Sequence, residues 1–261
     1  MLSESRTNLN RVDPMPSNQA VYRLTPRSTE INICHAASPD RSRVEGFIKT
    51  GFDRAYKAQV SEFSPELIYV EDTRIRAALG IRSARSTLFL EHYLDLPIEH
   101  YVSTSSIVPR SRIAEIGNLC SSNRRFTIAL FVAATAILKQ RKYTHAVFCA
   151  TKKVASIIES SGVELNRIAS ANGARLGDRL TEWGSYYECE PVIVSMSLAD
   201  VANAIARAEL ISLQVKSVLD PKSCPPSSKK IPIRTLTFTQ AKQVDLMLPR
   251  LESDMGAARC I

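Results

Sequence analysis

One stretch near the middle of the chain constrains the fold most strongly. Residues 111–120, SRIAEIGNLC, alternate like an extended strand and run directly into SSNRRFTIALFVAATAILKQRK. A Ser or Asn before a long apolar face is typical of a capped helix, here of about five turns, that packs on the sheet containing the strand. This strand-to-helix junction points to a layered α/β domain.

Strand and helix patterns alternate along most of the remaining chain. We expect further strands at 31–36, 66–72, 74–82, 86–93, 145–151 and 183–197, with 66–93 forming an antiparallel meander. Helices are predicted after Ser38 or Asp40, at Pro97, from Lys152 to a stop at Gly162, and from Leu198 onward. This order describes a three-layer α/β/α domain with a central mixed sheet.

Composition divides the chain into three parts. Residues 1–29 are rich in Ser, Asn, Arg and Pro and show no apolar period, so we expect a flexible leader. The folded domain is predicted over 30–212. Residues 213–261 form a basic extension with Pro and Ser turn signals at 220–232, which fits either a docking arm or a disordered appendage.

Several protein classes are excluded or disfavoured by simple counts. The longest charge-free run, Phe126–Leu138, has 13 residues, against about 20 for a membrane-spanning helix. The first residues lack a signal-peptide core, so a cytoplasmic location is expected. The six cysteines form no C-x-x-C pair, and the four histidines lack metal-ligand spacing, so no metal site is predicted.

The net charge of +8 favours an acidic partner. Nucleic acid, an anionic membrane surface, an acidic carrier protein and a phosphorylated cofactor all fit that charge. Because the Lys and Arg are dispersed and no helix-turn-helix or RNA-binding motif is present, nucleic acid is the least favoured of these. A serine hydrolase is not supported either, because no G-x-S-x-G elbow occurs.

Four blocks in chain order resemble a single family. They are LFLEHYLDLPIEHYVS, RSRIAEIGNLCS, AVFCATKKV and WGSYYECEPVIV, and they lie within about residues 43–200. They resemble the E-x-Y-L-D-x-P-I-E, R-x-x-I-x-E-x-G-N-L-A, V-F-T-x-T and W-G-x-Y-Y patterns of the thermostable hemolysin family. Cys149 departs from the third pattern, which more often has Thr there, while Thr151 keeps it.

This family is in turn similar to the acetyltransferase superfamily, and within it to acyl-homoserine-lactone synthases. The resemblance implies an acetyltransferase-like (GNAT) fold and a biosynthetic N-acyltransferase. Such an enzyme moves a fatty acyl group from an acidic acyl carrier protein or from acyl-CoA to the amine of a small acceptor, amino-acid-derived compounds among them. Its product is lipid-like, and the donor's phosphopantetheine or CoA is not bound permanently. The alternative is a non-enzymatic, membrane-active protein that lyses cells directly.

Glu115 is the best candidate for the catalytic base of such a reaction. The strand pattern places it on one face with Ile113 and Leu119, so its carboxylate lies among apolar neighbours. A buried carboxylate must be paired or protonated, or it must serve chemistry. A structural salt bridge with Arg82 or Arg110 is the alternative. By analogy, acyl-homoserine-lactone synthases keep a carboxylate beside the acceptor amine at this point of their sheet.

The loop after this strand is the predicted donor site. An ordinary acetyltransferase has a glycine-rich R/Q-x-x-G-x-G/A loop there, whereas this chain has CSSNRRF. Backbone N–H groups, the helix dipole and guanidinium groups can still hold a phosphate at such a helix start. The residues expected to do so are Ser121, Ser122, Asn123, Arg124 and Arg125.

The remaining candidates are residues for the substrates. Asn118 can donate its amide to a carbonyl as a second catalytic residue, or it can satisfy a bulge in the strand. The carboxylates of Glu91, Asp95 and Glu99 recur every four residues, which suits either a cationic head group or a solvated turn. The aromatic patch of Trp183, Tyr186 and Tyr187 can wall an acyl tunnel or pack in the core. The predicted substrate-binding set is therefore Arg82, Glu91, Asp95, Glu99, Thr151, Trp183 and Tyr186.

Overall fold

The computed structural model describes residues 30–103, 106–207 and 259–260 of the chain. The predicted leader at 1–29 and most of the predicted extension at 213–261 lie outside the described residues, as does the helix predicted beyond residue 207. No helix of the described part is long and apolar enough to cross a membrane.

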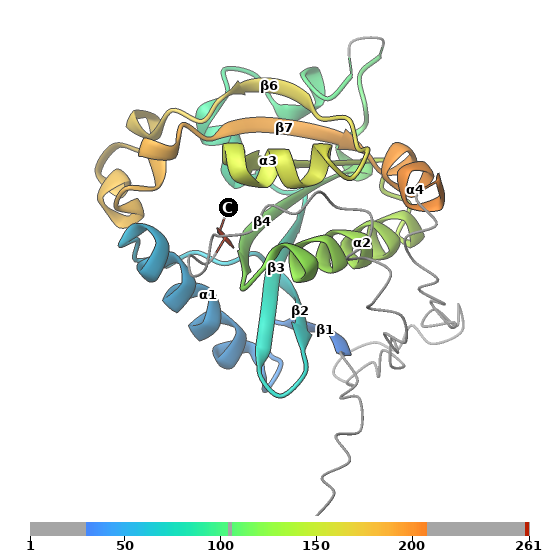
Figure 1. The fold of residues 1–261 in the computed structure, drawn as a ribbon. Helices are drawn as coiled ribbons and strands as arrows, with labels where there is room; N and C mark the ends of the chain where they lie inside the picture. Colours follow the sequence, from blue (N-terminus) through green and yellow to red (C-terminus); the bar gives the residue numbers. More distant parts are fainter. Residues whose placement is uncertain (1–29, 104–105, 208–258, 261) are drawn as a thin grey trace, which may run out of the picture.

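A central mixed sheet organises the described chain (Figure 1). Its strands, in spatial order, are β1 (Glu30–His35), β2 (Glu66–Glu71), β3 (Ile75–Ser83), β4 (Ile113–Ser121), β5 (His145–Ala150), β7 (Val192–Ser197) and β6 (Asn166–Ser170). Neighbouring strands are antiparallel except β4 and β5, which are parallel. The short β8 (Arg259–Cys260) pairs with the end of β4.

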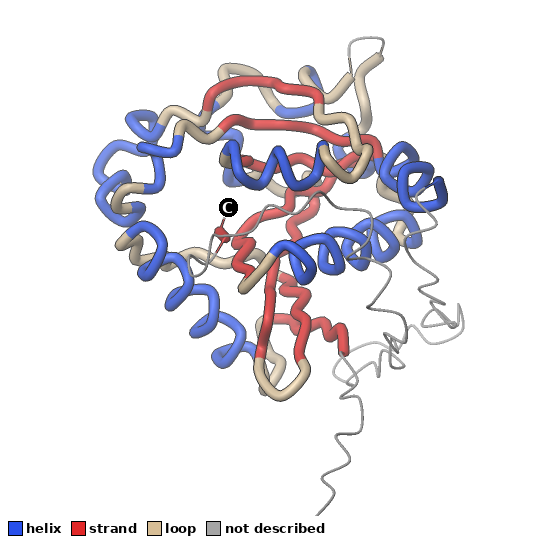
Figure 2. Tube along the Cα trace, in the orientation of Figure 1, coloured by secondary structure: helices blue, strands red, loops and turns tan. Residues whose placement is uncertain are grey.

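Helices cover both faces of this sheet, as the blue tubes on either side of the red strands show (Figure 2). One face packs against α2 (Arg124–Gln140), α3 (Lys152–Glu159) and α4 (Leu198–Arg207). The other packs against α1 (Arg41–Tyr56) and, over β4, β5 and β7, against the segment that follows β3. The predicted three-layer α/β arrangement with a central mixed sheet is confirmed.

The two parallel strands, β4 and β5, separate after a short paired stretch. β4 and β5 are in register only from Ile113 opposite His145 to Glu115 opposite Val147. Beyond Glu115, β4 continues alongside β3, and the sheet opens on the β5 side. The last β4 residue paired with β5 is therefore the carboxylate that the sequence singled out.

One of the predicted strands is wrong, and a second is confirmed only in part. Residues 86–93 were expected to be extended, but Phe89–Tyr93 form a 3-10 helix, η1, followed by a second one, η2, at Ile98–His100. The backbone N–H groups here bond to carboxylates, Leu88 to Glu91 and both Phe89 and Leu90 to Glu115, and not to a neighbouring strand. The helix predicted at Pro97 is confirmed by η2.

The strand predicted over 183–197 is confirmed only in its last part, β7. Only Val192–Ser197 is extended, and two 3-10 helices precede it, η4 at Gly173–Trp183 and η5 at Tyr186–Cys189. Between them, Gly184 adopts φ 51° and ψ −127°, which excludes a continuous strand.

The caps of the two long helices differ from each other. At α1 neither predicted cap acts through its side chain on the helix: Ser38 accepts from His35 N, and Asp40 makes no capping bond. At α2 the predicted cap is confirmed, because the Asn123 side chain accepts from Phe126 N at 3.1 Å.

Gly184 provides a test of how η4 is held against α1. A Cβ built on it would lie 2.1 Å from the carbonyl oxygen of Tyr56, in a backbone conformation that side chains rarely adopt. Gly184→Ala should therefore lower the free energy of unfolding by about 2 kcal/mol or more. Gly46→Ala, an exposed position of α1 with open space around it, should leave it unchanged or raise it slightly. Urea titration of both variants checks this, and equal midpoints would contradict it.

Candidate active site

A pocket with a cavity volume of about 60 Å³ lies where β4 leaves β5. β4 contributes Glu115 and the backbone bend that follows it, and β5 contributes Cys149. The opposite walls come from β3, from the loop before β2, from η1, and from the ends of η4 and η5. Segments far apart in the sequence thus meet around one carboxylate.

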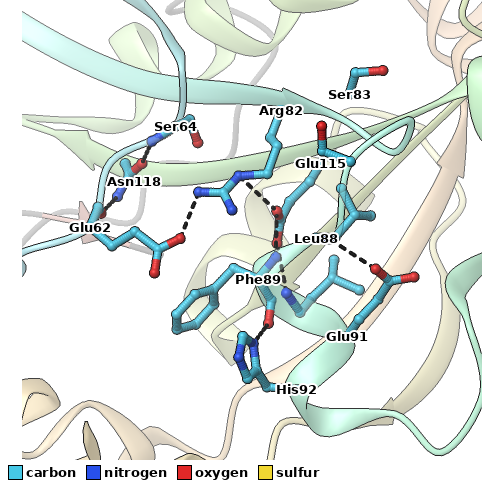
Figure 3. Close-up of polar contacts among 12 residues, drawn as sticks. Glu62, Ser64, Arg82, Ser83, Leu88, Phe89, Glu91, His92, Glu115 and Asn118 are labelled. Carbon is cyan, nitrogen blue, oxygen red and sulfur yellow. Dashed lines mark hydrogen bonds and ion pairs between the residues drawn. The ribbon is translucent and has the colours of Figure 1, made fainter. Parts of the chain in front are cut away.

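Glu115 is held from two sides (Figure 3). Its residue is 5% exposed, and its two carboxylate oxygens accept hydrogen bonds from the backbone N–H groups of Leu90 at 2.8 Å and Phe89 at 3.0 Å. The Nε of Arg82 lies 3.9 Å from the same carboxylate. The predicted burial is confirmed, and of the two arginines considered as salt-bridge partners, Arg82 is the neighbour.

Burial controls the protonation of this carboxylate. It raises the pKa of Glu115 to about 7, against the opposing effects of the N–H groups of Phe89 and Leu90 and of the Arg82 charge. A carboxyl group with a pKa near the working pH is present in both protonation states and can take up and release protons. The position therefore suits a general base.

A charge cluster adjoins Glu115: Glu62 and Arg82 line the pocket, and Arg179 lies behind them and pairs with Glu62. Arg82 Nη2 donates to Glu62 Oε1 at 2.7 Å, and Arg179 Nη2 donates to Glu62 Oε2 at 2.9 Å. Burial alone would raise the pKa of Glu62, but the two guanidinium groups outweigh it and lower the pKa below its ordinary value. Glu62 is therefore an ionised carboxylate shared by two arginines. Neither Glu62 nor Arg179 was predicted from the sequence, because nothing local to either residue signals the pairing.

Asn118 lies at a bulge in β4, with φ 52° and a shift in the pairing with β3. Its side-chain oxygen accepts from Ser64 N at 2.9 Å, and its amide nitrogen donates to the carbonyl of Glu62 at 3.1 Å. The side chain therefore fixes the loop that carries Glu62, as the bulge alternative expects. Its role as a donor to a substrate carbonyl stays a prediction.

Aromatic rings form the remaining wall of the pocket. The rings of Phe89 and Trp183 lie 5.4 Å apart between centroids, as do those of Trp183 and Tyr186. Trp183 and Tyr186 thus line the pocket as well as packing together, while Phe89 and Tyr93, which the sequence did not suggest, complete the wall. The indole N–H of Trp183 is buried and has no hydrogen-bond partner among the described residues.

Four of the predicted substrate residues lie outside the lining of this pocket. Glu91 and Glu99 both accept from Arg110 Nη1, at 2.6 and 2.7 Å, and Asp95 pairs with Arg175 at 2.8 Å. The three carboxylates do not share one helical face, because η1 ends before Asp95 and η2 begins after it. Thr151 is buried and caps α3 by accepting from Val154 N.

The predicted donor loop follows the carboxyl end of β4, on the side where β4 and β5 have separated. Because β4 and β5 are parallel, α2 and α3, which follow them, begin at the same edge. Ser121 donates to the carbonyl of Asn123 at 2.9 Å, and Arg124 Nη2 donates to Ser160 Oγ at 2.6 Å, which links the two helices. Phosphate binding by Ser121, Ser122, Asn123, Arg124 and Arg125 stays a prediction.

Comparison with known proteins identifies one family. The family model described as thermostable hemolysin matches residues 34–202. A search of curated proteins finds no significant relative.

Solved structures with similar folds are distant in sequence. The AHL synthase LasI is 10% identical with a TM-score of 0.48, over 65% of this chain and 90% of its own. FeeM, an N-acyl amino acid synthase from uncultured soil microbes, is 8% identical with a TM-score of 0.49, over 72% and 100%. MesI, a CoA-dependent acyl-homoserine lactone synthase, is 11% identical with a TM-score of 0.46, over 70% and 96%.

The raised pKa of Glu115 has a measurable effect on stability. Between the ordinary pKa of 4.5 and about 7, the folded state keeps a proton that the unfolded state has lost. Stability contributed by this residue is therefore complete below pH 4.5 and is lost as the pH rises to about 7. Relative to Glu115→Gln, the wild type should lose about 3 kcal/mol of unfolding free energy between pH 4.5 and 8. Denaturant titrations across this range test it, and a constant difference between the two proteins would refute it.

Proposed function

The chain belongs to the thermostable hemolysin family, and we propose that it is an N-acyltransferase. It transfers a fatty acyl group from an acyl carrier protein or acyl-CoA to the amine of a small acceptor, amino-acid-derived compounds among them, and forms a lipid-like product. The observation that carries this proposal is Glu115, a buried carboxylate with a pKa raised to about 7, which lines a pocket at the point where β4 and β5 part.

The reaction requires a neutral amine. A primary amine reaches the site as an ammonium ion, and the Glu115 carboxylate accepts one of its protons. The freed lone pair attacks the carbonyl carbon of the acyl thioester. The new C–N bond forms and the C–S bond breaks through a tetrahedral intermediate. The nitrogen loses its second proton, which the departing thiolate takes up, so the products are an amide and a thiol. The first proton stays on Glu115 and is released to water before the next turnover. The cavity of about 60 Å³ accommodates a small acceptor group better than a long chain.

The open edge of β4 supports a donor site next to this pocket. Residues 116–119 have no partner on the β5 side among the described residues, while the chain's own β8 pairs with the following two residues, Cys120 and Ser121. An extended arm with amide groups, such as phosphopantetheine, can pair with such an edge as an added strand does. Beyond the two residues that β8 covers, the N-terminus of the 17-residue helix α2 and its two arginines favour a phosphate.

The function is tested by mass spectrometry of lipid extracts. Cells that express the wild type should contain a new acylated amine, and Glu115→Gln should reduce it about a hundredfold or more, because the general base is lost. The matched control is Glu159→Gln, since Glu159 is an exposed glutamate of α3 that pairs only with Arg167 among the described contacts. Identical extracts from all strains, or lysis by the purified protein without any acyl donor, would instead favour the membrane-active alternative.

The donor site is tested separately by calorimetric titration with octanoyl-CoA. The double variant Arg124→Ala, Arg125→Ala should bind it about tenfold or more weakly, because charge-assisted bonds to the phosphates are lost. Lys139→Ala removes an exposed positive charge near the other end of the same helix and should bind normally. Equal affinity of the two variants would place the phosphates elsewhere.

A further inference from the structure

The charge cluster beside Glu115 carries more positive than negative charge. Two guanidinium groups, Arg82 and Arg179, share the single carboxylate of Glu62. Guanidinium groups stay charged at all ordinary pH values. Because burial raises the pKa of Cys149, Tyr93 and Tyr186, the other titratable groups of the lining are neutral near pH 7. When Glu115 is protonated, one positive charge remains without a counter-charge.

Both arginines keep unused hydrogen-bond donors. Arg82 Nε is buried and has no hydrogen-bond partner among the described residues, since the nearest carboxylate oxygen, Glu115 Oε2, is 3.9 Å away. A buried donor without a partner is costly, so an acceptor atom supplied by a ligand would be favourable there. Arg179 is 38% exposed, donates through one nitrogen to Glu62, and lies over the Phe89 ring, which itself lines the pocket.

We propose that the acceptor carries a carboxylate beside its amine, and that it is a free α-amino acid. This inference rests on the proposed acyl transfer and names its acceptor class. The amine faces Glu115, and the carboxylate binds Arg82 and Arg179 in place of part of their bonding to Glu62. When Glu115 is ionised, its carboxylate and the Arg82 guanidinium are opposite charges only 3.9 Å apart. One α-amino acid, whose nitrogen and carboxyl carbon are about 2.5 Å apart, is therefore compact enough to contact both groups.

The same charges select against other amines. An acceptor with an amine and no carboxylate would bring an ammonium ion towards two guanidinium groups, with only Glu62 and a partly protonated Glu115 to offset the repulsion. In a diamine or polyamine, each further ammonium group would be repelled by the guanidinium groups in the same way. The pocket therefore discriminates by the carboxylate rather than by the amine.

Binding of matched probes to the full-length protein tests this without requiring acyl transfer. The probes are L-leucine and L-phenylalanine, compared with isopentylamine and phenethylamine, which are the same molecules without the carboxylate. By ligand-observed NMR titration at pH 7, the acids should bind the wild type about tenfold or more tightly than the amines. Arg179→Ala should remove that preference by weakening the acids and not the amines.

The matched control is Arg175→Ala, an arginine of the same segment that pairs with Asp95 away from the pocket. It should keep the preference. Glu62→Gln should tighten acid binding, because it removes the competing negative charge, whereas a purely structural role of the cluster would weaken acid and amine alike. Equal binding of acids and amines to the wild type, no acid binding, or identical behaviour of the Arg179 and Arg175 variants would overturn the proposal.

The two proposals fail in different ways. An acylated amine without a carboxylate in the lipid extracts would leave the acyltransferase intact and overturn the amino acid acceptor. Arg179-dependent binding of the acids, with no acyl product under any donor, would keep the carboxylate site and overturn the acyl transfer.

Discussion

The hydrogen bonds between the Glu115 carboxylate and the backbone of η1 hold the site together. Each carboxylate oxygen accepts one N–H group, from Phe89 or from Leu90, at the point where β4 loses its pairing with β5. These bonds fix the start of η1 on the sheet and bring Phe89 and Tyr93 into the pocket wall. Because a carboxylate supplies the acceptors that a neighbouring strand would otherwise offer, the segment after β3 is free to leave the sheet.

The same carboxylate is costly to bury. Its pKa of about 7 means that the folded protein favours the protonated form more than the unfolded chain does. A carboxylate that served only as the acceptor of two N–H groups would not need a raised pKa. Full solvation of Glu115, or a close ion pair with it, would remove the rise in its pKa. Arg82, at 3.9 Å, is near enough to moderate the shift and too far to form a hydrogen bond, because its Nη2 bonds to Glu62. The arrangement keeps a proton acceptor available near neutral pH.

Backbone geometry and charge are coupled on the other side of the pocket. Asn118 occupies the β4 bulge and bonds to the backbone of residues 62 and 64, which fixes the loop from which Glu62 reaches its two arginines. On the neighbouring strand β3, position 80 must be glycine, since a Cβ there would lie 2.5 Å from Ser64 and 2.9 Å from the Asn118 oxygen. The bulge, the loop and the charge cluster therefore form one unit.

The sequence by itself determined most of the strands and the helices α1 to α4, the Asn123 cap of α2 and the burial of Glu115, because apolar periods and capping residues act between near neighbours. It did not predict β6. Only the tertiary structure decided that Arg110 binds Glu91 and Glu99, and that Glu62 joins Arg82 to Arg179, 117 residues away from it in the chain. It also decided that 86–93 and 183–190 are not strands. Charge pairs and carboxylate-to-backbone bonds between distant segments leave no local period, so they exist only once the sheet has brought those segments together.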